Sequence, residues 1–576
     1  MPVAVAGLAL VPFLPALDGE FVHWDDDVNF VDNPHYRGLG PVQLRWMLTT
    51  TLLGHWIPLT WLTLGLNYAI GGMNPWGYHL GNMLLHAANA ALVYFVVRRL
   101  LAAGFGGEPA RVGATTGAAV AALVFAVHPL RVESVVWVTE RRDVMCAAFY
   151  LLAVLGYLKG GGAGATGLRG PWRTVSVAAF AAALLSKSMA MTLPVTLLAL
   201  DVYPLRRLKL GWRALVAEKT PYLVLAGAGA AVAMLAVSRG GTWTGYDSHA
   251  WSARLAMTGY SLWFYPSRLV WAEGLSPLYE LPARVDPLAL RFLGPTAAVV
   301  GVTSLLVVFR RRFPGGLAAW VHSMIVLAPV AGLVHAGHHL AHDRYSYLSG
   351  LGLAGLAGAG VGWTVMAGQR THLRGWIVAG VLGAAGLAVL GWGAAAWRQT
   401  GIWQNSETLW RAAVRADDDC AICRNNLGAA LMLRHPTDPE ALTEAEEHLR
   451  SAIRLRPGYA DPYRSLAALY LQGGRPAEAE AVLLTMVRGF PDLADGPTRL
   501  ATLYAMQART EEAIALLREA LRRRPGLAAA RAELSRLLTG EAVPLTRDGR
   551  APEEATRVRE AEAVAPPSPA ARGARP

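Results

Sequence analysis

Four groups of polar side chains interrupt the apolar part of the sequence, and their types could carry out chemistry. The first is the acidic run 25–27, where adjacent carboxylates repel one another unless a proton or a cation lies among them. The second, at 128–143, mixes His, Glu, Arg and Asp; the third is Lys187; the fourth, at 335–347, gathers His, Asp, Arg and Tyr. Such carboxylates can accept a proton from a hydroxyl group, and such cations can stabilise a developing phosphate.

The composition indicates a membrane protein. Hydrophobic side chains make up 53% of the 576 residues and charged ones 16%, whereas soluble domains carry about 25% charge. A wholly soluble or disordered chain is thereby excluded, and three cysteines exclude a disulfide scaffold. We interpret the net charge of +12 as basic cytoplasmic loops, with no nucleic-acid partner.

Apolar runs up to residue 397 predict about eleven membrane spans. They lie at 1–17, 78–97, 113–127, 144–158, 175–185, 189–200, 222–237, 287–309, 318–333, 347–366 and 376–397. The run 252–271 contains too many polar residues and is interpreted as interfacial or re-entrant. The first run could instead be a signal peptide, although it lacks a basic stretch before its apolar core.

The positions of Lys and Arg predict how the spans are oriented. With the N-terminus inside, most basic residues of the short loops lie inside, and the long loop 18–77 lies outside. All four polar groups then meet the outer end of a span, and this shared location favours a functional site. Taken singly, each has a plainer explanation, such as a solvated turn, a charge-paired surface helix or a lysine extending to water. The clustered histidines His335, His338, His339 and His342 suggest a metal, but a zinc site is disfavoured.

Residues 398–540 predict an array of tetratricopeptide (TPR) repeats. Pro457, Pro491 and Pro525 recur at the 34-residue period of this repeat, and other positions keep the same step. After an odd number of spans the array lies outside, and residues 541–576 are predicted to be disordered. Cys420 and Cys423 could form a disulfide, half of a metal site, or two small helix-packing positions.

Several motifs together resemble one known family. They are W-D-D at 24–26, Y-H-L-G-N at 78–82, H-P-L-R-V-E-S at 128–134, S-K-S at 186–188, D-R-Y-S-Y-L at 343–348 and W-x-N-S-E-T-L-W at 403–410. The sequence resembles bacterial TPR-containing membrane proteins, which are similar to the eukaryotic transmembrane-and-TPR O-mannosyltransferases of the GT-C glycosyltransferase superfamily. The resemblance implies an all-α fold, in which a polytopic GT-C-like domain, 1–397, precedes a TPR α-solenoid.

The resemblance also implies roles for individual residues. Asp25 and Asp26 would be catalytic, and Asp27 leaves the register of this pair uncertain by one residue. Binding of the donor phosphate, or lining of its site, would involve His128, Glu133, Arg141, Asp143, Lys187, Asp343, Arg344 and Tyr347. A divalent metal, if there is one, would be held by Asp25 and Asp26; the sequence leaves this undecided.

The function implied is an enzymatic one. A GT-C type glycosyltransferase would move a sugar, mannose in the named relatives, from a polyprenyl-phosphate carrier to an acceptor hydroxyl group at the outer face of the bacterial inner membrane. The TPR array would present a protein or peptide in the periplasm. One alternative is a non-enzymatic, membrane-anchored TPR scaffold for envelope or polysaccharide assembly. Another is a transporter of lipid-linked sugars, which would place its charges near the middle of the membrane.

Overall fold

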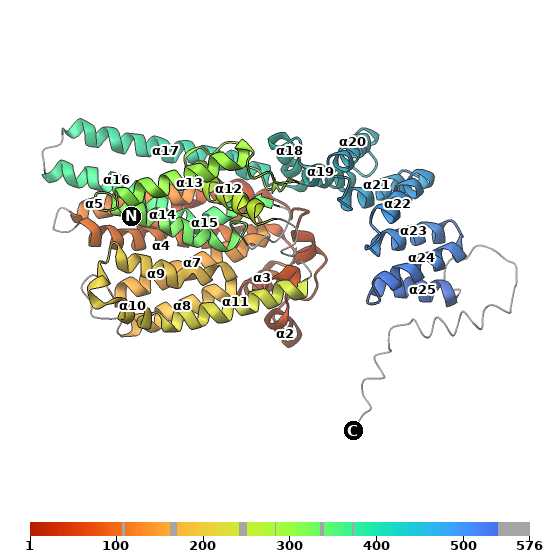
Figure 1. Cartoon of the computed structure of the whole chain (residues 1–576), viewed down its shortest axis with the longest axis horizontal. Helices are drawn as coiled ribbons and strands as arrows, with labels where there is room; N and C mark the ends of the chain where they lie inside the picture. The colour runs from red at the N-terminus through yellow and green to blue at the C-terminus, as the bar shows by residue number, and fades with distance from the viewer. Residues whose placement is uncertain are drawn as a thin grey trace, which may run out of the picture. The chain divides into compact units, whose positions relative to one another are not determined.

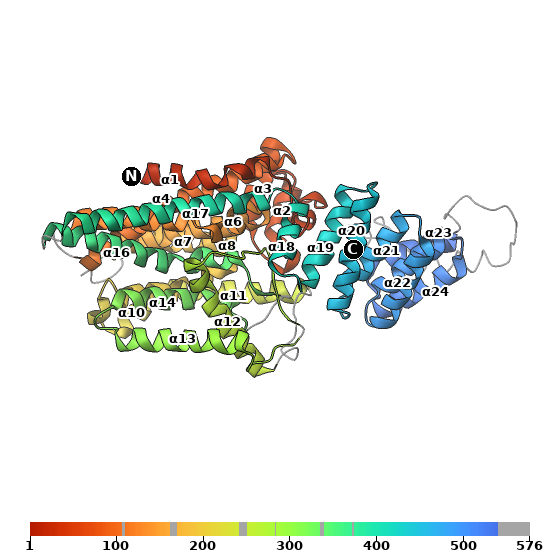
Figure 2. The same cartoon turned by 90° about the horizontal axis from the view of Figure 1, so that it is seen from above.

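The protein folds into two compact units, Met1–Asp418 and Asp419–Pro576. The structure is a computed structural model that describes residues 1–105, 110–161, 170–240, 250–282, 284–333, 339–370 and 374–539. The described residues are almost wholly helical, as predicted, and Figures 1 and 2 show their arrangement. Two short strands, β1 (Tyr279–Glu280) and β2 (His339–Ala341), pair antiparallel in the first unit.

The first unit is built from long helices that run side by side (Figure 1). They are α1 (Pro2–Leu10), α4 (Pro75–Phe105), α5 (Ala110–Val127), α7 (Arg141–Gly160), α8 (Pro171–Ser186), α9 (Leu193–Val202), α11 (Thr220–Gly240), α12 (Trp251–Val270), α13 (Leu290–Val308), α14 (Pro314–Leu327), α16 (Leu351–Arg370) and α17 (Gly375–Ile402). Shorter helices, among them α2 (Pro41–Thr49), α3 (Pro58–Gly71) and α6 (Val132–Val136), carry the loops at one end.

The chain is a multi-pass membrane protein. Six described helices are long and apolar enough to cross a membrane, or seven if the pair Arg111–Val127 and Pro129–Val136, bent by 61°, is one span. Each of the eleven predicted segments contains or overlaps a helix. The remaining segments are shorter, so the count of eleven stays a prediction. The run 252–271 forms α12, which does not pass the same test of length and apolarity.

Glycines allow the central helices to approach closely. Gly113 and Gly117 of α5 face the backbone of Gly362 and Gly358 of α16, and a Cβ atom at any of these positions would collide with the opposing carbonyl group. Small residues four apart are a common way to pack helices in a membrane, where no hydrophobic force drives helices together.

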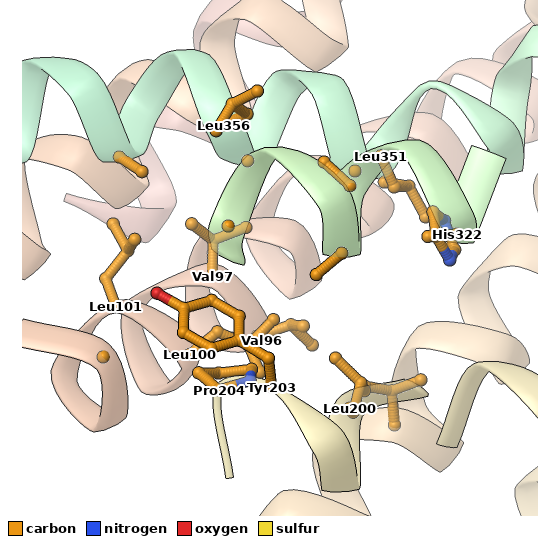
Figure 3. A pocket seen from close by; sticks show the side chains of 18 of the residues that line it. Val96, Val97, Leu100, Leu101, Leu200, Tyr203, Pro204, His322, Leu351 and Leu356 are labelled. Carbon is orange, nitrogen blue, oxygen red and sulfur yellow. The ribbon is translucent and has the colours of Figure 1, made fainter. Parts of the chain in front are cut away.

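An apolar groove lies among α4, α7, α9, α14 and α16 (Figure 3). Nearly all of its lining side chains are apolar. Leu351 and His322 lie at one end of the groove, and Leu101 and Tyr203 at the other. Since Leu351 begins α16 and Leu101 lies near the end of α4, the groove extends along the helices.

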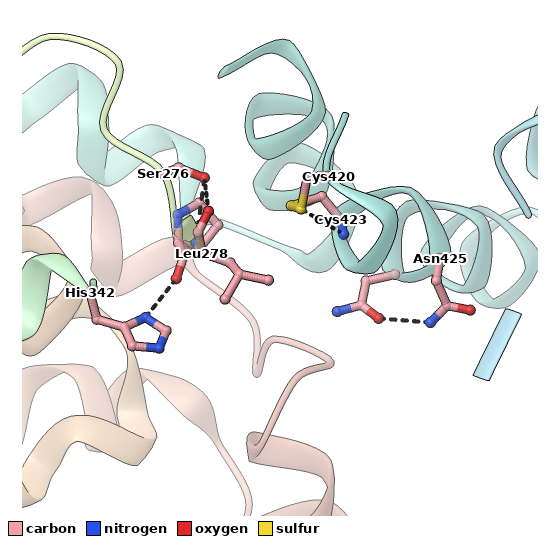
Figure 4. The surroundings of a disulfide bond; sticks show 8 residues. Ser276, Leu278, His342, Cys420, Cys423 and Asn425 are labelled. Atoms are coloured by element: carbon pink, nitrogen blue, oxygen red, sulfur yellow. Dashed lines mark hydrogen bonds between the residues drawn. A yellow bond between two sulfur atoms is a disulfide. The ribbon is translucent and has the colours of Figure 1, made fainter. Parts of the chain in front are cut away.

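The described part of the second unit consists of three helix pairs and one further helix. They are α19 (Ala421–Arg434) with α20 (Pro439–Leu455), α21 (Asp461–Gln472) with α22 (Pro476–Gly489), α23 (Asp495–Met506) with α24 (Thr510–Arg523), and finally α25 (Ala528–Thr539). Cys420 and Cys423 form a disulfide at the start of α19 (Figure 4). The predicted domain boundary after residue 397 falls inside α17, and α18 (Ser406–Ala416) belongs to the first unit. The predicted disordered tail, 541–576, lies outside the described residues.

Candidate functional site

A network of buried charges joins segments that are far apart in the sequence. Lys187, between α8 and the next turn, donates to Glu140 at 3.0 Å and to Asp143 at 2.5 Å. Arg142 pairs with Glu140 at 2.5 Å. The carboxylates come from the start of α7 and the turn before it, so helix α7 positions one face of the network.

Arg344 completes this network. It lies in a short 3-10 turn, Asp343–Tyr345, and its backbone N–H donates to Glu133 at 2.9 Å. Its guanidinium pairs with Glu133 and, through Nε at 3.3 Å, with Glu140. Glu140 therefore contacts three cations, Arg142, Lys187 and Arg344. The predicted residues Glu133, Asp143, Lys187 and Arg344 are thus brought together, as a site would require.

Arg141 is held elsewhere. Its guanidinium donates to Asn82 at 2.5 Å, to Asn67 at 2.5 Å and to the carbonyl oxygen of Tyr78 at 2.7 Å. These acceptors are neutral and belong to α3 and α4, so Arg141 connects helices. The neighbouring Arg142, which the sequence analysis did not select, is the arginine that shares the Glu140 carboxylate with Lys187 and Arg344.

The structure separates the roles of the two candidate acids. Asp26 is buried, and it accepts hydrogen bonds from the Thr139 backbone at 3.1 Å, the Thr139 hydroxyl at 2.6 Å and the Val22 backbone at 3.0 Å. Burial raises its pKa to about 7, against these hydrogen bonds. Both of its oxygens are engaged, so Asp26 fastens the loop to the turn before α7.

Asp25 is only half-buried and faces the charged network. Burial raises the pKa of Asp25, and the positive charges of Arg142 and Arg344 act in the opposite direction. Asp27, the third acid, is paired with His23 at 3.1 Å. Of the three acids, Asp25 is therefore the one whose surroundings include two cations of the network, Arg142 and Arg344.

Three other predicted residues surround the network without entering it. His128 is buried, and its Nε2 lies 3.1 Å from the Leu269 carbonyl oxygen. Tyr347 is buried, with its hydroxyl 2.7 Å from His86 Nδ1. Asp343 accepts a hydrogen bond from the Tyr279 hydroxyl at 2.9 Å rather than pairing with Arg344. These contacts connect helices and loops next to the network, so they stabilise the segments that carry it.

The histidine group is only partly described. His335 and His338 lie outside the described residues, whereas the rings of His339 and His342 lie 4.1 Å apart. His342 is hydrogen-bonded to the Pro277 carbonyl oxygen at 3.1 Å (Figure 4). Among the described residues no group of three or more His, Cys, Asp or Glu side chains is arranged to hold a metal ion. A metal held by Asp25 and Asp26 therefore stays a prediction.

His55 is a further histidine of the loop 18–77, and it was not among the selected site residues. It follows a strained turn in which Leu53 has φ 52°, a conformation rare for non-glycine residues. Its side chain is exposed to solvent, and the positive charges of Arg142 and Lys187 oppose its protonation. Neither periodicity nor a neighbouring charge in the sequence marks this histidine.

These features define a polytopic membrane protein with a charged site at one end of its helices and an attached helical repeat. The tetratricopeptide repeat family model matches residues 438–506. Human protein O-mannosyl-transferase TMTC4 is 36% identical over 170 residues, 27% of this chain and 22% of that protein. Drosophila melanogaster protein O-mannosyl-transferase Tmtc1 is 37% identical over 160 residues, 26% of this chain and 17% of that protein.

A solved structure is also similar: ArnT from Cupriavidus metallidurans, crystallised with undecaprenyl phosphate. It is 16% identical and covers 86% of this chain and 80% of its own, with a TM-score of 0.35. The chain spans less than a quarter of the length of the two O-mannosyltransferases. It is a distant homologue of these transmembrane-and-TPR O-mannosyltransferases, and it contains tetratricopeptide repeats.

Proposed function

We propose that this protein is a membrane glycosyltransferase that moves a sugar from a polyprenyl-phosphate carrier to an acceptor hydroxyl group. The observation that carries the proposal is the buried cluster of three cations on Glu140, with half-buried Asp25 close enough to feel the charges of two of them, Arg142 and Arg344. Charges buried in a membrane protein are costly, and they usually mark function. The distant homology to O-mannosyltransferases supports mannose as the sugar and a protein as the acceptor.

The apolar groove supports a lipid-linked donor. Tyr150, which lines the groove, follows Asp143 by two turns of α7, so the groove begins about 10 Å from the charged network along the helix. A prenyl chain would lie along the groove between α4 and α16, while its phosphate reaches Lys187 and Arg344. The end of the groove at Leu351 is the end nearer to the network, because Tyr347 precedes it in the same segment.

In the proposed reaction the acceptor oxygen attacks the anomeric carbon, and the bond from that carbon to the phosphate oxygen breaks. Asp25 takes the hydroxyl proton, and polyprenyl phosphate leaves with the electron pair of the broken bond. Arg142, Lys187 and Arg344 stabilise the negative charge that develops on this phosphate. Because each cation is already paired with a carboxylate, the phosphate competes with Glu133, Glu140 and Asp143 for them. A single displacement of this kind inverts the configuration at the sugar.

The proposed location is the outer face of the bacterial inner membrane, with the TPR unit in the periplasm. The Cys420–Cys423 disulfide supports this location, because disulfides persist in oxidising compartments and are rare in the cytosol. The basic short loops assigned to the inside support the same orientation. In this arrangement the repeats would present a polypeptide acceptor, since stacked helix pairs form an extended concave surface.

A glycoproteomic comparison in cells tests the proposed function. A deletion strain would be complemented with the wild-type chain, with Asp25→Asn, or with the control Asp32→Asn, whose side chain is exposed in the same loop. We expect one class of protein-linked glycan to disappear in the deletion and Asp25→Asn strains and to return with the control. Return of the glycan with Asp25→Asn, or no glycan difference at all, would instead support the scaffold alternative.

A further inference from the structure

The motif W-x-N-S-E-T-L-W, residues 403–410, contacts the loop that carries the candidate acids. The Glu20 backbone N–H donates to the Gln404 carbonyl oxygen at 2.8 Å, and the His23 backbone N–H donates to the Ser406 hydroxyl at 2.7 Å. The Trp410 indole N–H donates to the His23 carbonyl oxygen at 3.4 Å. The backbone on the N-terminal side of Asp25 is therefore bonded to a segment almost four hundred residues away in the sequence.

Aromatic rings extend this contact to the residue next to Asp25. The ring of Trp24 lies 4.8 Å from that of Trp410 and 5.1 Å from that of Trp137. The Arg344 guanidinium lies over Trp137, 5.3 Å from its ring centre. Trp24 is therefore held between the motif on one side and, on the other, a tryptophan that packs against a cation of the network.

The local structure of the motif gives a role to several of its residues. Asn405 and Thr408 form a reciprocal capping box that starts α18, each side chain bonding to the backbone of the other. This cap places Ser406 in the first turn of α18 and Trp410 one turn later. The two side chains therefore lie on the same face of the helix. Trp410 and Trp403 are almost fully buried, and the ring of Trp403 packs at a tilt against that of Trp137, with the ring centres 5.8 Å apart.

We infer that residues 403–410 are a positioning element of the catalytic centre, in which Ser406 and Trp410 hold the acid loop so that Asp25 faces the cations. This inference rests on the proposed function of the same site. The segment acts on Asp25 through residues 20–24, so its residues are positioning residues and not catalytic ones. If residues 403–410 position the acid loop, α18 is part of the transferase domain, although the motif lies next to the repeats in the sequence.

The test uses the full chain in lipid nanodiscs with a synthetic polyprenyl-phosphate sugar as the donor. The variants are Ser406→Ala, Trp410→Ala and Trp410→Phe, and the control is Arg415→Ala, an exposed residue near the end of the same helix. We expect Ser406→Ala and Trp410→Ala to lower kcat about 10- to 100-fold at an unchanged donor KM, as small misplacements do. Trp410→Phe keeps a ring against Trp24 and should recover part of this loss, while the control keeps full activity.

The pH profile separates positioning from general stability. Asp25 is surrounded by Arg142, Arg344, Glu140 and Asp27, so moving its loop changes the charges it meets and should shift the acidic limb of the kcat profile. A purely structural role would lower the melting temperature and the yield but leave kcat per folded molecule and the pH profile as in the wild type. That outcome would overturn the inference.

A second measurement does not depend on activity. Cysteines introduced together by Glu20→Cys and Gln404→Cys should be joined by a short, flexible thiol-reactive cross-linker that mass spectrometry detects, because their backbones are hydrogen-bonded and so lie close together. Absence of the cross-link in a folded, active protein would overturn the inference alone. A cross-link in a wild-type background that transfers no sugar would instead overturn the proposed function, and with it the role assigned to this contact.

Discussion

The two units of the protein use the same charged residues in opposite ways. In the repeats, Glu446 accepts from the Tyr470 hydroxyl and pairs with Arg475, and 34 residues later Glu480 does the same with Tyr504 and Arg509. The glutamate and arginine side chains of these pairs are partly exposed, and the two tyrosines are buried. In the membrane unit the network around Glu140 is buried and has no repeat. Periodic, partly exposed pairs fit a scaffold, whereas a buried network in which one carboxylate contacts three cations needs a further explanation.

The largest difference is expected when one carboxylate is removed from each unit. Glu140→Gln leaves three cations with less compensation in a buried site, and breaking a buried pair costs about 3–5 kcal/mol. The matched change Glu446→Gln should cost about 1 kcal/mol or less, since that pair is close to solvent. Denaturant unfolding of the full chain, followed separately for each unit, measures both. Equal costs would remove the contrast between the units.

The next effect concerns the geometry of the cations. Arg344→Lys keeps a positive charge but loses the planar fork that pairs with Glu133 and Glu140, so transfer should fall at least about tenfold. The same change in the repeats, Arg475→Lys, should leave transfer unchanged. A transfer assay on both variants in nanodiscs sharpens the comparison, and wild-type activity of Arg344→Lys would show that only its charge matters.

His55 should affect activity without affecting stability. The residue is exposed to solvent and follows the strained turn at Leu53, so His55→Ala should keep the melting temperature of the wild type. If its ring contacts the substrate beside Arg142 and Lys187, kcat should fall about tenfold or more, and added imidazole should restore part of it. Unchanged kinetics would place His55 outside the site.

A smaller effect concerns the pH dependence of stability. The pKa of Asp26 is raised to about 7 in the folded protein, above its usual value near 4. The folded state therefore binds more protons between these values, and its stability should fall as the pH rises from about 4 to 7. Asp26→Asn removes this group and should flatten the curve, while Asp25→Asn changes it less. Parallel curves for the wild type and Asp26→Asn would contradict the role given to Asp26.

The helical architecture could be predicted from the sequence because apolar runs and the 34-residue period act locally. The membership of the charged network could not be predicted to the residue. Arg141 and Arg142 are adjacent on the first turn of α7, where neighbouring side chains point about 100° apart. One bonds to Asn67 and Asn82, and the other reaches Glu140. Only the packing of α4 against α7 decides between them.

The same limit applies to the acids. Asp25 and Asp26 lie in an irregular loop, so no periodicity indicates which side chain turns inward to Thr139 and which faces the cations. The contact between residues 20–24 and the motif 403–410 was also not predictable, since it joins opposite parts of the chain. His55 carries no sequence signal, because its position depends on the turn at Leu53.

The most direct test of the central claim is transfer by purified Asp25→Asn and Asp32→Asn in nanodiscs, with a synthetic polyprenyl-phosphate sugar and a peptide acceptor. Asp25 faces the cations, whereas Asp32 is exposed in the same loop. The account predicts that Asp25→Asn retains the folded structure but loses transfer by at least about 100-fold, while Asp32→Asn transfers sugar at the wild-type rate. Equal transfer by Asp25→Asn and the wild type would contradict the account.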